Sequence, residues 1–131
     1  MKNTILRECL RISRAHNTEE LHSEWGCFHH FSFIIQGNKI IEWATNKAGD
    51  PLITRGYPKG SKRHSESEAF RKAKGLLDRQ RPFQCVNIRL IKNNGIRISK
   101  PCECCYAFLQ DEGCAEVYFT TDIGYFANIK L

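Results

Sequence analysis

Two short segments of the sequence carry side chains that could bind a metal ion. One is His64-Ser65-Glu66 and the other is Pro101-Cys102-Glu103-Cys104-Cys105. Cys102 and Cys105 are three positions apart, so their sulfur atoms would point the same way on the first turn of a helix. The free backbone N–H groups and the dipole at a helix start favour thiolate over thiol, and a proline is tolerated there. The second segment is therefore typical of a pair of thiolate metal ligands.

His64 is the residue that could complete this ligand set. A structural zinc site has four protein ligands, and the sequence shows no second Cys or His pair to supply them. One His with two Cys leaves a coordination position open, which is typical of a catalytic site. Glu66 does not share a helix face with His64, so both reach one cavity only if His64 lies at the lip of the helix. A carboxylate there, not bound to the metal, would serve as a proton shuttle.

Each of these segments has another interpretation when taken alone. A Pro-Cys-x-x-Cys segment can be a redox or structural pair, and a His-x-Glu segment occurs by chance in many proteins. Cys104 is a rival ligand through its Cys-x-Cys spacing, although we expect it to face the core. We expect the four isolated cysteines to fill the core as well: Cys9, Cys27, Cys85 and Cys114.

The cysteine content and the absence of long apolar stretches predict a cytoplasmic protein. Seven cysteines, three of them within four positions, fit a disulfide framework poorly and favour a reducing compartment. No stretch approaches the roughly 18 uninterrupted apolar residues of a membrane helix. The first twenty residues carry charges where a signal peptide would have its apolar centre. We therefore expect no membrane segment.

The positive charge is concentrated in one segment. The chain has 20 Lys and Arg against 14 Asp and Glu, and residues 55–81 supply the whole excess of +6. Such a field suggests a polyanionic partner such as single-stranded DNA or RNA, although a merely solvated surface is equally compatible with it. Arg63 is a candidate phosphate contact, and Tyr57 and Trp43 are candidate stacking surfaces. Trp43 lies on an expected strand, so it could instead pack within the sheet.

The pattern along the chain predicts the elements that must position these residues. A length of 131 residues with 41% hydrophobic residues indicates one domain, residues 1–131, with one core. Helical periodicity covers residues 3–16, 65–79 and 101–112, and residues 48–63 form an expected loop. The expected strands are 31–35 and 39–45, joined by a Gly37-Asn38 turn, then 86–91 with 96–98, 116–121 and 125–131. This alternation predicts an α/β sheet with helices covering its faces.

The last two strands should pair antiparallel. A parallel crossover needs about a dozen residues or more, whereas only a few separate Thr121 from Tyr125. The C-terminal strand could also be an exposed edge that pairs with a second copy in a homo-oligomer.

With its His-x-Glu and Pro-Cys-x-x-Cys segments in this order, the chain resembles the zinc-dependent cytidine deaminase superfamily. The resemblance implies a three-layer α-β-α sandwich around a central mixed sheet of about five strands. It implies one zinc ion per chain, bound by His64, Cys102 and Cys105, with Glu66 carrying the proton from the attacking water to the ring nitrogen and the departing ammonia. It also implies that Asn46 contacts the sugar.

Two features of the chain bear on this resemblance. The gap between Glu66 and Pro101 is somewhat long, and the turn at residues 93–95 accounts for the surplus. An antiparallel final pair resembles the free-nucleoside cytidine deaminases and the toxin-like DNA or RNA deaminases more than the deoxycytidylate and tRNA-adenosine branches.

The function implied by the resemblance is hydrolytic deamination of cytosine to uracil with release of ammonia. The substrate would be a nucleoside, a nucleotide or a single-stranded nucleic acid, and the sequence does not decide among them. Two alternatives stay open: an adenine or guanine deaminase on the same scaffold, and a non-catalytic, zinc-stabilised module that binds nucleic acid. Glu66 beside a three-ligand site argues against the module, because a structural site does not need an open coordination position.

Overall fold

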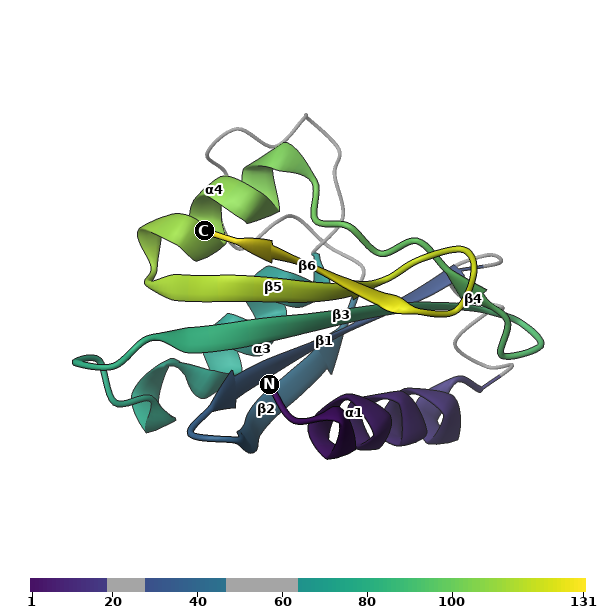
Figure 1. Cartoon of the computed structure of the whole chain (residues 1–131), viewed down its shortest axis with the longest axis horizontal. Helices are drawn as coiled ribbons and strands as arrows, with labels where there is room; N and C mark the ends of the chain where they lie inside the picture. The colour runs from purple at the N-terminus through teal and green to yellow at the C-terminus, as the bar shows by residue number, and fades with distance from the viewer. Residues whose placement is uncertain (19–27, 47–63) are drawn as a thin grey trace.

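The structure, a computed structural model, describes residues 1–18, 28–46 and 64–131. Its centre is a six-stranded sheet with the order β2-β1-β3-β5-β6, and β4 pairs with β3 outside this path (Figure 1). Strands β3 and β5 run parallel and the other pairs run antiparallel, so the sheet is mixed. The strands are β1 (Phe28–Gln36), β2 (Lys39–Thr45), β3 (Phe83–Ile91), β4 (Ile96–Arg97), β5 (Cys114–Thr120) and β6 (Phe126–Lys130).

The α-helices of the described residues are α1 (Asn3–His16), α3 (Ser65–Ala73) and α4 (Glu103–Asp111). A short 3-10 helix, η1 (Lys74–Leu76), follows α3 directly. The longest helix, α1, has 14 residues, and within the described ranges no helix is both long and apolar enough to cross a membrane.

Two apolar clusters lie on opposite faces of the sheet. Successive strand residues point to opposite faces, so Phe31 and Phe33 of β1 pack with the buried Ile5 and Cys9 of α1. Ile34, the residue after Phe33, points to the other face and packs with buried residues of α3 and α4. The predicted α/β sheet with helices on both faces is therefore confirmed.

Local turn chemistry places the strand connections as predicted. Gly37 and Asn38 both have φ of 59° and join β1 to β2, which is the geometry of a tight hairpin turn. Strands β5 and β6 pair antiparallel from Glu116 opposite Lys130 to Thr120 opposite Phe126. The predictions of an N-terminal hairpin and of an antiparallel final pair are both confirmed.

The predicted ends of two helices were wrong. The helix expected over 65–79 ends at Ala73 and continues only as η1, which contains Gly75. Glycine weakens a helix interior because it loses more backbone entropy than other residues. The helix expected from residue 101 begins at Glu103, because Cys102 has an extended backbone with φ −67° and ψ 164°.

Candidate metal centre

The N-termini of α3 and α4 position the candidate metal ligands. His64 is the N-cap of α3, with φ −82° and ψ 147°, and it lies at the lip of the helix as expected from its spacing to Glu66. Cys102 is the N-cap of α4, and its sulfur accepts a hydrogen bond from the backbone N–H of Cys105 at 3.5 Å. Cys105 lies in the first turn of the same helix and is buried. The sequence thus places each ligand at or beside a helix start.

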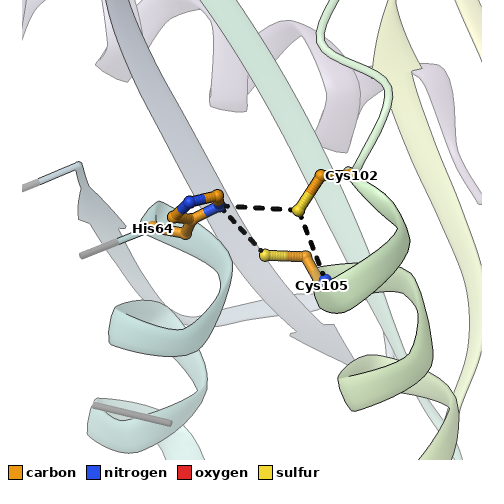
Figure 2. Close-up of side chains that lie close together, drawn as sticks. All are labelled: His64, Cys102 and Cys105. Atoms are coloured by element: carbon orange, nitrogen blue, oxygen red, sulfur yellow. Dashed lines mark hydrogen bonds between the residues drawn. The ribbon is translucent and has the colours of Figure 1, made fainter. Parts of the chain in front are cut away.

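The three predicted ligand atoms lie together (Figure 2). His64 Nδ1 is 3.7 Å from the sulfur of Cys102 and 3.3 Å from the sulfur of Cys105. All three ligand atoms lie within 4.8 Å of one another, so the group could hold one metal ion. The prediction that residues so far apart in the chain converge on one site is confirmed.

The electrostatics of the group prepare it for a cation. The hydrogen bond with the Cys105 side chain lowers the pKa of Cys102, and His64 lowers it further, whereas burial raises it. The net result is a pKa of about 4. The hydrogen bond to Cys102 raises the pKa of His64, although burial acts the other way. Cys102 is therefore a thiolate at neutral pH, which is the form that binds metals.

A cavity of about 260 Å³ opens beside the ligands, and Glu66 lies in its wall. Its other polar lining includes Asn46 and His30 from the β1–β2 side and Ser99 and Lys100 from the segment before α4. The site therefore combines a metal-binding group, a carboxylate and hydrogen-bonding side chains around one space.

The carboxylate of Glu66 is buried and held by two donors. Asn87 Nδ2 donates to Oε2 at 3.0 Å, and Ser65 Oγ lies 3.2 Å from Oε1. Burial has the largest influence and raises the pKa of Glu66, while its own backbone, the nearby His64 and the Asn87 amide act in the opposite direction. The protonated form of Glu66 is thus more accessible near neutral pH than that of an exposed glutamate.

The hydrogen-bond circuit around Glu66 has room for one more proton. Ser32 Oγ donates to Asn87 Oδ1 at 2.7 Å and also lies 2.7 Å from Ser65 Oγ. The single hydrogen of Ser32 is used on Asn87, and Ser65 also has one hydrogen, which it can give to Glu66 Oε1 when Glu66 is ionised or to Ser32 when Glu66 is protonated. A proton on Glu66 Oε1 could then donate to Ser65 and complete the ring. The geometry therefore accommodates both the ionised and the protonated form of Glu66.

Of the predicted substrate contacts that the structure describes, Asn46 lines the cavity and Trp43 does not. Asn46 lies in the cavity wall, where its Oδ1 accepts a hydrogen bond from the backbone N–H of His30 at 3.1 Å. The ring of Trp43 packs on the α1 face of the sheet, 6.0 Å from the ring of Phe33 and 4.6 Å from that of His16. The structure therefore does not bring Trp43 to the cavity. Tyr57 and Arg63 lie outside the described residues.

Several residues at the site were not found from the sequence. Ser32 and Asn87 are fully or nearly buried in the middle of β1 and β3, and His30, Ser99 and Lys100 line the cavity. The sequence did contain one indication of these residues, because a polar residue interrupts each of two apolar strands: Ser32 in β1 and Asn87 in β3. That signal says that a buried partner is needed, but it does not say which segment supplies it.

Three of the remaining cysteines fill the core as predicted, whereas the prediction that Cys104 faces the core was wrong. Cys9, Cys85 and Cys114 are buried in the apolar clusters. Cys104 is half-buried rather than in the core, and the metal-binding group of the described residues does not include it. Cys27 lies outside the described residues.

The described part of the basic segment is largely paired with carboxylates. Its ion pairs are Arg71–Glu68 at 3.3 Å, Lys72–Glu42 at 3.4 Å, Arg79–Glu112 at 3.2 Å and Arg81–Asp78 at 3.0 Å. Paired charges contribute less to an external field than free ones, so a polyanion contact would depend mainly on residues 55–63. Those residues lie outside the described ranges.

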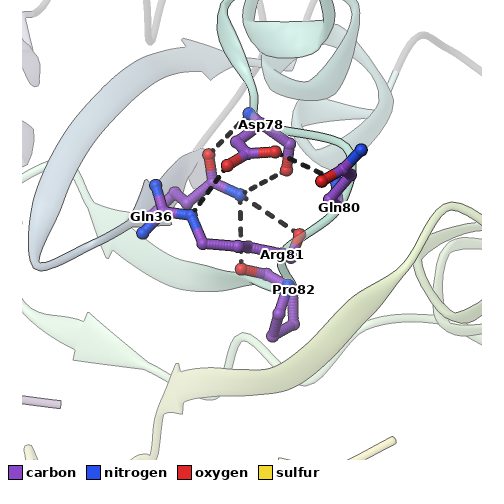
Figure 3. Close-up of polar contacts among 5 residues, drawn as sticks. All are labelled: Gln36, Asp78, Gln80, Arg81 and Pro82. Atoms are coloured by element: carbon purple, nitrogen blue, oxygen red, sulfur yellow. Dashed lines mark hydrogen bonds and ion pairs between the residues drawn. The ribbon is translucent and has the colours of Figure 1, made fainter.

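The last of these pairs belongs to a connection at the far end of β1 from the cavity (Figure 3). Gln36 Nε2 contacts the carbonyl oxygens of Asp78, Arg81 and Pro82 at 2.9, 3.2 and 3.3 Å, and Gln36 Oε1 accepts from the backbone N–H of Asp78 at 2.8 Å. Gln36 is six residues from His30, about 20 Å along an extended strand. Arg81 therefore serves the fold rather than the site.

Comparisons with known proteins do not assign the chain to a family. No model of a known protein family matches it, and no curated protein matches it either. The functional assignment therefore depends on the two motifs and on the geometry of the site.

Proposed function

We propose that this protein is a zinc-dependent hydrolase that deaminates a cytosine base to uracil. The observation that carries the proposal is the convergence of His64, Cys102 and Cys105 within 4.8 Å, with Glu66 in the wall of the adjoining cavity. The layered α-β-α arrangement and the helix-terminal position of the ligands agree with the resemblance to the cytidine deaminase superfamily.

The donor set fits zinc. Zinc bonds of about 2.3 Å to sulfur and 2.0–2.1 Å to nitrogen, at tetrahedral angles, require sulfur and nitrogen to be about 3.6 Å apart. The observed separations of 3.3 and 3.7 Å bracket that value. Three protein ligands leave a position for water, and zinc bound there would supply the Lewis acid that makes water a nucleophile at neutral pH.

Glu66 is the residue that we assign to proton transfer. A water oxygen forms a bond to C4 of the base while the Glu66 carboxylate takes one of its protons and delivers it to the ring nitrogen N3. A second proton passes to the exocyclic amine, the C4–N bond breaks, and ammonia leaves with uracil as the product. The burial of Glu66 and the ring of hydrogen bonds around it support this role, because they allow both protonation states.

Asn46 is the residue that we assign to the sugar. Its carboxamide is fixed through the His30 backbone, so its position does not depend on the substrate. Whether the sugar belongs to a free nucleoside, a nucleotide or a single strand depends on residues beyond the cavity wall. A single-stranded substrate would use the basic residues between 55 and 63.

The test is release of ammonia from a panel of substrates by the zinc-loaded protein. The panel contains cytosine, the nucleosides cytidine and deoxycytidine, the monophosphates of these two nucleosides, adenosine, guanine and a mixed single-stranded oligonucleotide. Glu66→Gln is the matched control, because it keeps the shape and an oxygen for Asn87 but cannot carry the proton. We expect it to retain zinc and to lose at least about 100-fold in turnover.

The outcomes separate the alternatives. Turnover of adenosine or guanine alone would replace cytosine by a purine, and zinc binding without any turnover, equal in wild type and Glu66→Gln, would favour a binding module. For the oligonucleotide, turnover that falls by orders of magnitude with added salt indicates several phosphate contacts. Turnover of a free nucleoside should respond much less.

A further inference from the structure

The side-chain amide of Asn87 in β3 makes all four hydrogen bonds that an amide can make. Its Nδ2 donates to Glu66 Oε2 at 3.0 Å and to the carbonyl oxygen of Ser99 at 3.3 Å. Its Oδ1 accepts from Ser32 Oγ at 2.7 Å and from the Cys85 thiol at 3.4 Å. Because a carbonyl oxygen cannot donate, the Nδ2 group must face Ser99 and Glu66. The orientation of the amide is therefore fixed.

The partners of Asn87 belong to both halves of the metal centre. Glu66 lies two residues after His64, and Ser99 lies three residues before Cys102. Ser99 is itself held, because its Oγ donates to the backbone carbonyl of Asn87 at 2.8 Å and its N–H donates to that of Thr120 at 2.9 Å. Asn87 thus connects the start of α3 to the segment that leads into α4.

An apolar side chain of similar size would fill the same space in β3. A buried amide costs free energy unless its donors and acceptor are satisfied, so its use here needs polar partners in place. Asn87 is only 4% exposed and does not line the cavity. It cannot touch a substrate there, and its contact with the site is through the Glu66 carboxylate.

We propose that Asn87 is a positioning residue for the deamination, which holds the plane of the Glu66 carboxylate through the Nδ2–Oε2 hydrogen bond. The inference rests on the proposed function, in which Glu66 transfers the protons. A carboxylate free to rotate would spend part of its time away from the attacking water and the ring nitrogen. Loss of the bond should therefore slow the chemical step more than substrate binding.

The test compares Asn87→Asp with wild type, both loaded with zinc. Aspartate has the size of asparagine but, when ionised, cannot donate to Glu66, and it places an oxygen opposite Oε2. We expect kcat to fall about 10- to 100-fold, with KM within about twofold and zinc still bound at one per chain. Asn87→Ser removes the amide donors without adding charge, so it covers the cases in which the paired carboxylates prevent folding or share a proton, and the same result is expected.

Cys85→Ala is the matched control for a purely structural role. It removes one of the two buried donors to the Oδ1 atom of the same amide and leaves the bond to Glu66 in place. We expect its melting temperature to fall while kcat stays within about twofold of wild type. A kcat of Asn87→Asp that is unchanged, or a loss shared equally by Cys85→Ala, would overturn the proposal.

Crystal structures of the zinc-loaded proteins supply the second readout. We expect the Glu66 carboxylate to be rotated or spread over several positions in Asn87→Asp and to keep its position in Cys85→Ala. An undisplaced Glu66 in both Asn87→Asp and Asn87→Ser would overturn the proposal even if kcat fell. If wild type deaminates no base, the proposed function has failed, and the position of Glu66 in these structures then decides the positioning role by itself.

Discussion

Replacing Cys102 by serine tests the metal centre with little damage to the fold. Cys102 is exposed, and its side chain caps α4 by accepting the backbone N–H of Cys105. Serine is a preferred N-cap residue, so the helix start should keep its stabilising contact. Serine is a far weaker zinc ligand than a thiolate, and the ligand set would be reduced to His64 and Cys105. The substitution therefore separates metal binding from folding.

The expected size of the effect follows from ligand linkage. At a free zinc concentration 100-fold above the dissociation constant, binding to the native state stabilises it by about 2.7 kcal/mol. For a chain of this length, each kcal/mol moves the melting temperature by roughly 3–5 °C, so zinc should raise it by roughly 10 °C. If Cys102→Ser weakens binding about 100-fold, about 0.4 kcal/mol remains, or roughly 2 °C.

The assay is thermal unfolding with chelator and with buffered zinc, together with metal analysis of the purified protein. Cys104→Ser is the matched control, because it makes the same chemical change two positions further along, at a sulfur outside the ligand group. We expect Cys104→Ser to keep the zinc-dependent shift and the metal content of wild type. The proposed ligand set is wrong if Cys102→Ser keeps the full shift or if Cys104→Ser loses it.

Two further predictions concern stability. The ring of Phe70 is buried between the rings of Phe83 and Phe108, with centroid distances of 5.6 and 5.4 Å. Phe70→Ala should therefore lower the unfolding free energy measured in urea by about 3–5 kcal/mol. Leu76→Ala is the control at an exposed position and should change it by no more than about 0.5 kcal/mol. Equal costs would contradict the assigned core. Burial, followed by the charges of Arg89, His64 and His29, lowers the pKa of His30 to about 4, so between pH 6.5 and 4 the unfolded state binds the additional proton. The unfolding free energy of zinc-free protein should therefore fall by about 1–3 kcal/mol as the pH is lowered through this window, and His30→Gln should lose that part of the decrease; an unchanged slope in the variant would refute the assignment.

Local sequence was sufficient for the ligands and for most of the elements. The spacing of Cys102 and Cys105 depends only on the first turn of one helix, and the antiparallel final pair depends only on the length of one connection. The Gly37-Asn38 turn likewise needs only backbone conformations that glycine and asparagine adopt readily. These features could be predicted because each is decided by residues close together in the chain.

The residues that surround the site could be identified only once the pairing of the strands in the sheet was known. Ser32 faces Asn87 because β1 pairs with β3 in one register, and a shift of β1 by one residue would turn Ser32 to the α1 face, away from Asn87. The same alternation sends Trp43 to the α1 face and Ala44 to the α3 face, a choice that the strand pattern left undecided.

The candidate ligands and the candidate carboxylate could be identified from the sequence alone, because their chemistry depends on residue type and spacing. Three features were decided only by the tertiary structure: the convergence of His64 with two cysteines 38 and 41 residues away, the hydrogen bond of Asn87 to Glu66, and the pairing of the basic residues. Such contacts join separate strands and helices, and the energy that selects them comes from packing and hydrogen bonding across the whole sheet rather than from any one segment.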